Sequence, residues 1–335
     1  MIEEGGIFIF IYRGGRAPLV PFACVHPCIT SIDAFAFERN SNLRFADFHN
    51  FVSRVERHAF CLCSSLTQMV MPGVTIVGYS AFYACLNLFS VVFGNSLETI
   101  EESAFDQCTS LRHIKMPSVI RIGQRAFQDC AVAELDLPRD LEVVEGYAFC
   151  GCLSLERVSM PLKEGMIQDG AFLSCERLSR VDLIGGIHDV VSSLHLEVWR
   201  NDMNDEINRI NRVLPLPSAR DKTTEIQEWM QSVLNSIEHY KGEHYALLKE
   251  VMSIIELAVW NVKLLEAEKD RDGDDNKKSI TTTTSSSTSP SSSLEENLSN
   301  LKIDNEVSFR QEQRVNCCAG VVIKNVLPFL TKLDQ

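Results

Sequence analysis

The chain has 335 residues, of which 45% are apolar and 23% are charged, and its formal net charge is −13. This length fits one large or two ordinary domains, and the composition is that of a globular protein. No block of basic residues is present to neutralise phosphates, which argues against a nucleic-acid partner. The apolar run Ile7–Tyr12 follows two glutamates and is too short for a signal peptide or a membrane span. We therefore expect a cytoplasmic protein without a membrane span.

Residues 1–29 are expected to cap the N-terminal end of the repeats that follow. Ile7–Tyr12 has the composition of a strand, residues 13–16 (Arg-Gly-Gly-Arg) that of a turn, and residues 19–25 allow a return strand. A stack of repeats without a cap would expose an unpaired strand edge and an apolar core.

Residues 30–185 repeat one pattern, Ala-Phe-x-x-Cys, six times at intervals of 22 or 23 residues. One period earlier, Ala36-Phe37 is followed by Asn40 in the cysteine position. Asn and Cys are the two residues that leucine-rich repeats use at this turn. The phenylalanines of the six copies are Phe60, Phe82, Phe105, Phe127, Phe149 and Phe172.

The rest of the period has the pattern of a short strand. A leucine follows the cysteine position by three residues, and alternating apolar residues come next, such as Met69 and Met71 or Val158 and Met160. Apolar positions in fixed register at this period predict a leucine-rich-repeat β-solenoid of about seven 22–23-residue units, whose neighbours bury one another's apolar side chains. In one unit Ala133 replaces the leucine, which predicts a local deletion or bulge.

The pattern Leu-x-x-Ile-x-Met-Pro, followed by Ile-Gly-x-x-Ala-Phe-x-x-Cys, closely resembles the Treponema-type, or BspA-like, leucine-rich repeat, most clearly over residues 111–130. The resemblance covers about half the chain. It implies a curved, non-enzymatic recognition solenoid, and some bacterial members act as surface adhesins. The helical region after the repeats resembles the C-terminal portion found with such repeats in diatom proteins, and that resemblance implies no activity.

Residues 186–268 are predicted to form a three-helix region packed against the C-terminal end of the solenoid, so that the fold class is α+β. One apolar face contains Trp199, Met203, Ile207, Ile210 and Leu214, and prolines end that helix. The second helix, with Ile226, Trp229, Val233, Ile237 and Tyr240, is expected to end before a third over residues 243–268. The apolar positions of the third are Leu247, Leu248, Val251, Ile254, Ile255, Ala258 and Val262.

Residues 269–305 are polar, and thirteen of the fifteen residues 279–293 are Ser or Thr. Such a composition predicts a disordered linker. The C-terminal apolar segment, residues 306–335, contains the apolar stretch 315–330, which either folds back onto the helices or binds a partner.

The cysteines do not have the spacing of a metal site. Cys61-x-Cys63 and Cys150-x-Cys152 each include a repeat position, so packed thiols are the favoured interpretation over zinc ligands. Cys24, His26 and Cys28 form the one close grouping outside the repeat. We expect free, buried thiols, no metal and no cofactor. No nucleophile elbow, metalloprotease motif or phosphate loop is present, so we do not expect an enzyme.

The strand residues between the inward positions should point outward on the concave face, and we predict that they bind a protein partner. The alternative is a solvated sheet face, and a slip of one residue would invert the assignment. A secreted or surface adhesin, or a structural protein that oligomerises through its helices, are the other functional hypotheses. The predicted partner-binding residues are Gln68, Val70, Ser90, Val92, His113, Lys115, Glu134, Asp136, Arg157, Ser159, Arg180 and Asp182.

Overall fold

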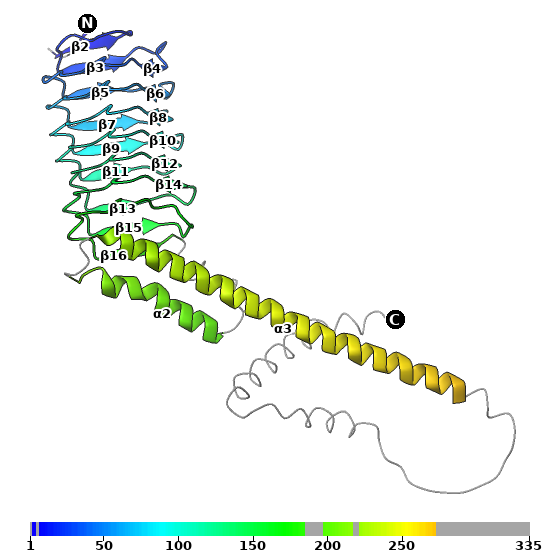
Figure 1. Cartoon of the computed structure of the whole chain (residues 1–335). Helices are drawn as coiled ribbons and strands as arrows, with labels where there is room; N and C mark the ends of the chain where they lie inside the picture. The colour runs from blue at the N-terminus through cyan, green and yellow to red at the C-terminus, as the bar shows by residue number, and fades with distance from the viewer. Residues whose placement is uncertain (1, 5–6, 185–196, 217–220, 273–335) are drawn as a thin grey trace, which may run out of the picture. The chain divides into compact units, whose positions relative to one another are not determined.

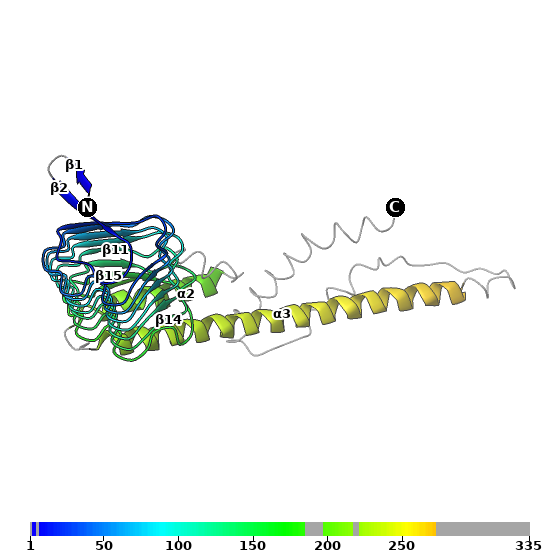
Figure 2. The same cartoon turned by 90° about the horizontal axis from the view of Figure 1, so that it is seen from above.

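A computed structural model describes residues 2–4, 7–184, 197–216 and 221–272. It divides into two compact units, Met1–Glu238 and His239–Gln335. The first unit contains a β-solenoid, whose coils stack from β2 to β16 in Figure 1 and superimpose when seen along the stack in Figure 2. The predicted β-solenoid of about seven coils is therefore confirmed.

Each coil contributes one longer strand to one side of the solenoid. These strands are β2 (Ile7–Tyr12), β3 (Phe22–Val25), β5 (Phe45–Asp47), β7 (Gln68–Met71), β9 (Ser90–Phe93), β11 (His113–Lys115), β13 (Glu134–Asp136), β15 (Arg157–Met160) and β16 (Arg180–Leu183). They pair in parallel as three ladders, β2-β3-β5, β7-β9-β11 and β13-β15-β16, and β1 (Ile2–Glu4) adds to the first ladder in antiparallel orientation.

A second ribbon consists of two-residue strands that form one continuous parallel sheet in the order β14-β12-β10-β8-β6-β4. In chain order these are β4 (Ser31–Ile32), β6 (Arg54–Val55), β8 (Ile76–Val77), β10 (Thr99–Ile100), β12 (Arg121–Ile122) and β14 (Val143–Val144). The second residue of each is buried, which is the apolar position that precedes each repeat phenylalanine by five residues.

The predicted irregularity near Ala133 coincides with the break between the β7-β9-β11 and β13-β15-β16 ladders. Val132, not Ala133, is the fully buried side chain in the leucine position. The segment from Cys130 to Val132 is thus one residue shorter than the corresponding segment from Cys108 to Leu111. This deletion accompanies the break between β11 and β13.

The repeat phenylalanines form a single stacked column in the core. Successive rings from Phe37 to Phe172 lie 4.9 to 5.6 Å apart between centroids and within 7° of parallel. All seven are buried to 1% exposure or less. Tyr12 continues the column at its N-terminal end, 5.1 Å from Phe37, and its hydroxyl accepts a hydrogen bond from the Asp33 amide at 3.1 Å.

The repeat cysteines form a second ladder beside the rings. Each thiol donates a hydrogen bond to the carbonyl of the phenylalanine in the preceding coil, as from Cys63 to Phe37 at 3.0 Å and from Cys108 to Phe82 at 3.1 Å. Asn40 donates instead through its side-chain amide to the carbonyl of Pro18, an exposed residue, at 3.1 Å. Asn and Cys at this position thus share the role of a small donor to a backbone carbonyl of the preceding coil.

The Ala-Phe-x-x-Cys turn places two residues of each coil in the left-handed region of the backbone, one before the alanine and one before the cysteine position. Among the described coils only Gly151 and Gly170 are glycines at these positions. The other twelve carry side chains and include Gln107 at a φ of 59°. Left-handed conformation costs a residue with a Cβ about 1 kcal/mol, so these turns store strain that the stacked core outweighs.

The N-terminal segment differs from its prediction. The strand Ile7–Tyr12 and the turn through Gly14 and Gly15 are confirmed, with positive φ at both glycines. The return strand is wrong in orientation, because β3 pairs with β2 in parallel. Residues 7–29 thus add a further coil rather than a hairpin, and β1 supplies the antiparallel strand at this end.

The first unit ends in α2 (Glu197–Val213) and the beginning of α3 (Lys222–Asp272), which replace the hydrogen bonds of a missing next coil. In each coil the phenylalanine amide donates to the alanine carbonyl of the coil that follows, as from Phe149 to Ala171 at 2.8 Å. At the last coil, the Phe172 amide donates instead to Thr223 Oγ1 at 2.8 Å. The side-chain amide of Asn211 likewise accepts from the Val181 amide and donates to its carbonyl.

The three-helix prediction is wrong in number, because one continuous helix, α3, spans the second and third predicted helices. The expected break contains Gly242 but no proline, and a single glycine costs a helix about 1 kcal/mol, which is too little to end it. The apolar faces of the first two predicted helices are confirmed, since Trp199, Met203, Trp229 and Val233 are buried. α3 also continues to Asp272, four residues into the predicted linker 269–305.

Two predictions fall outside the described residues. They concern the polar linker beyond Asp272 and the C-terminal apolar segment 306–335.

Candidate interaction surface

On each long strand, the residues immediately before and after a buried residue point outward. All twelve predicted partner-binding residues are exposed or half-buried, while the alternate residues Met69, Val91, Leu135 and Val158 are buried. The predicted strand register is therefore confirmed. We call the outward side of the long strands the strand face.

Parallel pairing aligns the strand-face residues into two columns. On the N-terminal side of the break, Gln68, Ser90 and His113 are neighbours in one column, and Val70, Val92 and Lys115 are neighbours in the other. On the C-terminal side, Glu134, Arg157 and Arg180 are neighbours, and so are Asp136, Ser159 and Asp182. The structure thus brings the twelve residues together as two groups of six.

The C-terminal group is an ion-pair network. Arg157 contacts Asp182 at 2.6 Å, Asp136 at 3.1 Å and Glu134 at 3.8 Å, and Arg180 contacts Asp182 at 2.9 Å. Burial alone would raise the pKa of Asp182, but hydrogen bonds from Arg157 and Arg180 outweigh it and hold that pKa below its ordinary value. Its hydrogen bond to Asp182 also raises the pKa of Arg157. These charges satisfy one another within the chain.

The N-terminal group contains no acidic side chain, and Lys115 is its one permanent charge. Val70 is 48% exposed, and Phe89, which precedes β9, is 45% exposed. The Phe89 ring meets the His113 ring edge-on at a centroid distance of 4.9 Å. No ion pair is found among Gln68, Val70, Ser90, Val92, His113 and Lys115 in the described part of the chain. A partner that binds these side chains therefore pays a lower desolvation cost than one that binds the ion-pair network of the C-terminal group.

The strand face extends beyond the predicted residues toward the N-terminus, where it is hollowed. A cavity of about 550 Å³ is lined by outward side chains of β2, β3 and β5, with His26 and Pro27 at its edge. Phe22 pairs with Phe45, and Cys24 pairs with both Ile11 and Asp47, so these residues continue the two columns. The outward lining residues of the strands are Ile9, Ile11, Phe22, Cys24, Phe45 and Asp47.

Sequence reasoning missed the β2 and β3 part of this face because it interpreted residues 1–29 as a cap, and it began the outward residues at Gln68, one coil after β5. The alternation in Phe22–Val25 and Phe45–Asp47 was the available signal, since Ala23, Val25 and Ala46 are buried between outward residues. A hairpin and a further coil share this alternation, so only the parallel pairing distinguishes them.

The thiols of the first unit differ sharply in accessibility. Burial raises the pKa of the Cys63 and Cys175 thiols to about 12, whereas Cys28 is exposed. The ten cysteines of the described residues are free and seven of them are buried, whereas Cys24 and Cys150 are half-buried and Cys28 is exposed. Within the same residues, no group of three or more His, Cys, Asp or Glu side chains is placed to hold a metal ion. Cys317 and Cys318 lie outside the described part.

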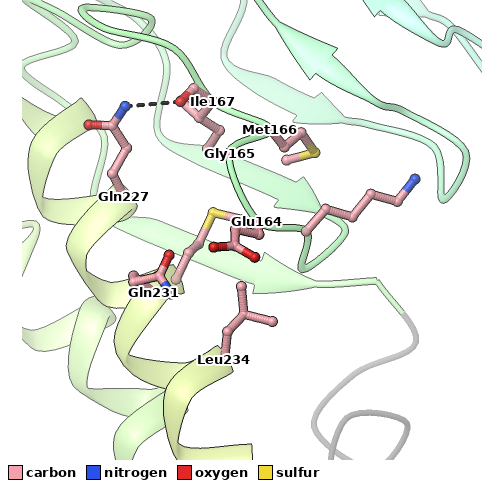
Figure 3. A pocket seen from close by; sticks show the side chains of 9 residues that line it. Glu164, Gly165, Met166, Ile167, Gln227, Gln231 and Leu234 are labelled. Carbon is pink, nitrogen blue, oxygen red and sulfur yellow. Dashed lines mark hydrogen bonds between the residues drawn. The ribbon is translucent and has the colours of Figure 1, made fainter. Parts of the chain in front are cut away.

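A second, smaller cavity of about 170 Å³ lies where the last coil meets α3 (Figure 3). Met166 and Met230 in its lining are buried, and Gln227 donates a hydrogen bond to the Ile167 carbonyl at 2.9 Å. That bond attaches α3 to the coil. We interpret this cavity as a packing space of the C-terminal cap, because its size is below that of ordinary ligand sites.

Comparison with known families identifies the repeat. The BspA type leucine rich repeat region matches residues 30–121 and 75–194, in six copies. This chain carries a BspA-type leucine-rich repeat. Repeats of this family are typically non-enzymatic. Among curated proteins, no sequence matches this chain.

Several solved bacterial structures are similar to part of this chain. The leucine-rich repeat protein of T. pallidum is 32% identical, over 39% of this chain and 62% of that one, with a TM-score of 0.38. A leucine-rich cell surface protein of Faecalibacterium prausnitzii is 22% identical, over 48% of this chain and 54% of that one, with a TM-score of 0.33. The pneumococcal vaccine antigen PcpA is 17% identical, over 51% and 54%, with a TM-score of 0.30. This chain thus spans less than two thirds of each.

No helix in the described ranges is both long and apolar enough to span a membrane. The cytoplasmic location and the adhesin alternative expected from the sequence both stay predictions.

Proposed function

We propose that this chain is a non-enzymatic interaction protein that binds a protein partner on the N-terminal half of the strand face, from β2 to β11. The proposal depends on one observation. The inward strand positions are apolar in every coil and the Ala-Phe pair recurs unchanged, whereas the outward positions of β7, β9 and β11 include apolar, polar and basic side chains that form no ion pairs with one another in the described part of the chain. A constant core with a varied, accessible face is the arrangement that solenoids use for recognition.

The apolar cavity supplies the anchor for such a partner. At about 550 Å³ it has room for a large apolar or aromatic side chain, and buried aromatic or aliphatic anchors dominate the energy of protein interfaces. Asp47 is exposed at the cavity and favours a basic group beside the anchor. Along β7 to β11, Gln68, Ser90 and His113 offer hydrogen bonds to a backbone that follows the columns.

The proposal is tested by capture of a partner from a lysate of the source cells, with matched variants. Phe45→Asp places a carboxylate in the cavity wall, and Val70→Asp places one on the exposed face. Leu153→Asp is the control, because Leu153 is 57% exposed and lies in a turn away from the strand face. Urea unfolding of each variant establishes that it is folded.

We expect one partner to be captured by the native chain and the Leu153 variant and to be lost by both strand-face variants. Retention of the same partner by both folded strand-face variants would refute the proposal. Charge reversal at Arg157 or Arg180 is unsuitable for this purpose, because it would place a carboxylate beside Asp182 and Asp136 and destabilise the ion-pair network.

A further inference from the structure

The second unit contains a long apolar surface on a helix. Residues 239–272 continue α3, and only four of the nineteen residues 247–265 are charged. Many of its large apolar side chains are exposed in the structure, including Ile254 at 52%, Val262 at 55% and Leu265 at 60%. A soluble helix ordinarily buries such a face, because burial of an apolar face supplies most of its stability.

These apolar residues follow a heptad. Leu248, Val251, Ile255, Ala258, Val262 and Leu265 are separated by alternate steps of three and four residues. That spacing puts them in one stripe, which we call the seam, at the positions that face a partner helix in a coiled coil. The branched side chains Ile255 and Val262 fall at alternate seam positions, an arrangement that favours two-stranded coiled coils.

The positions beside the seam carry no charge. On one side they are Tyr245, Met252 and Val259, and on the other Leu247, Ile254 and Asn261. The charges Lys249, Glu250, Glu256 and Lys263 all lie away from it. Flanking charges of a coiled coil either attract or repel those of the partner helix and so select the partner and its orientation. Because the flanks of this seam are uncharged over residues 245–265, two copies can pair there without like charges meeting.

The exposed area is sufficient for a pair. Weighting the side-chain areas of the seam and its flanks by their exposed fractions gives on the order of 500 Å² of apolar surface per copy. Two copies would bury about 1,000 Å², which is the lower limit for a specific interface. The helix itself needs such packing, because it includes Gly242 and the β-branched residues Val251, Ile254 and Ile255, all of which lower intrinsic helix stability.

We propose that the seam binds the seam of a second copy of this chain, forming a two-stranded coiled coil over residues 245–265 and a homodimer. This proposal is independent of the partner-binding function assigned to the strand face.

The test is the mass of the full chain in solution, measured by sedimentation velocity from about 1 to 100 μM. We expect a species of twice the 37.7 kDa chain mass. Val251→Lys with Ile255→Lys places two lysines in the seam and should weaken association at least about 100-fold. The matched control is Ser253→Lys with Leu257→Lys, which adds the same charge on the opposite side of the helix, where Leu257 is 67% exposed. Circular dichroism checks that helix content is retained.

Dimers of the native chain and the control, with monomers of the seam variant, would support the proposal. A native chain that is monomeric at 100 μM would overturn it. In that case slow hydrogen exchange over residues 247–265 would indicate that residues 315–330 of the same chain cover the seam, and binding to lipid vesicles would indicate a membrane surface. A dimer lost only in the control would overturn it too, because the contact would then lie on the side of Leu257.

Discussion

Asp106 is a buried carboxylic acid whose ionisation should destabilise the solenoid at neutral pH. It lies in the turn of the Phe105 coil at 7% exposure, and its Oδ1 has no hydrogen-bond partner among the described residues. Burial, and next the nearby charge of Asp129, raise its pKa from 3.8 to about 6, while Ser103 and Arg125 act in the opposite direction. Because the side chain is almost fully buried, its charge is poorly solvated.

The sign of the effect follows from linkage. Because the folded state holds the proton of Asp106 more tightly than the unfolded state, the contribution of Asp106 to the free energy of unfolding is greatest below pH 4 and falls as the pH rises to about 6. The total loss is about 3 kcal/mol, from a difference of about two pKa units. Asp106→Asn removes the charge and keeps the shape. The variant should therefore match the native chain near pH 4 and exceed its stability at pH 7.5 by up to about 3 kcal/mol.

Urea unfolding followed by circular dichroism at pH 4.5, 6 and 7.5 measures this difference. Asp182 and Glu206, whose pKa values are lowered, lose their stabilising contribution as the pH falls, but they do so equally in both proteins and cancel. Asp140→Asn, which removes a carboxylate at an exposed position, is the matched control. A stability difference between native chain and Asp106 variant that is the same at all three pH values would refute the reasoning.

The remaining predictions concern the stacked core and its end, and urea unfolding measures each. Phe105→Ala should lower the free energy of unfolding by about 3–5 kcal/mol, whereas Phe51→Ala, at a side chain 71% exposed, should change it by less than about 0.5. Gln107→Gly should raise it by about 1 kcal/mol, because it relieves a φ of 59°; a loss would show that the turn is unstrained. Thr223→Val should lower it by about 1–3 kcal/mol, because the Phe172 amide would lose its acceptor; no change would show that the helical cap is dispensable.

The sequence was sufficient to predict the solenoid because the same apolar pattern recurs in each coil and neighbouring coils bury it. Phe105 and Cys108 occupy positions that recur in each coil. Because the period is 22 or 23 residues, their neighbours are the equivalent residues of the adjacent coils. The outward position of Lys115 followed from the same register, since alternate residues of a strand face opposite sides. Even the break between β11 and β13 had a local signal, because Ala133 stands in the leucine position.

Other features depended on pairings that no local pattern contains. The parallel pairing of β3 with β2 decides between a coil and a hairpin, yet both have the same alternation. Arg157 meets Asp136 and Asp182, which are 21 and 25 residues away, so its ion pairs depend on the register between coils. Thr223 is 51 residues from Phe172, and a threonine in the first turn of a helix does not by itself indicate such a distant contact. The continuity of α3 through Gly242 depends on a balance of about 1 kcal/mol, which composition alone does not decide.

The two proposed surfaces lie in different compact units, and this separation makes their effects distinguishable. A dimer formed through the seam carries two strand faces, so a partner that presents two copies of its own binding segment would bind with an avidity about 10²–10⁴ times greater than either contact alone, provided that both can be engaged together. A partner with one segment would gain nothing. Val251→Lys with Ile255→Lys should therefore leave capture of a single-segment partner unchanged, whereas Val70→Asp should abolish that capture and leave the dimer intact. Loss of both properties in either variant would mean that the two surfaces are one site.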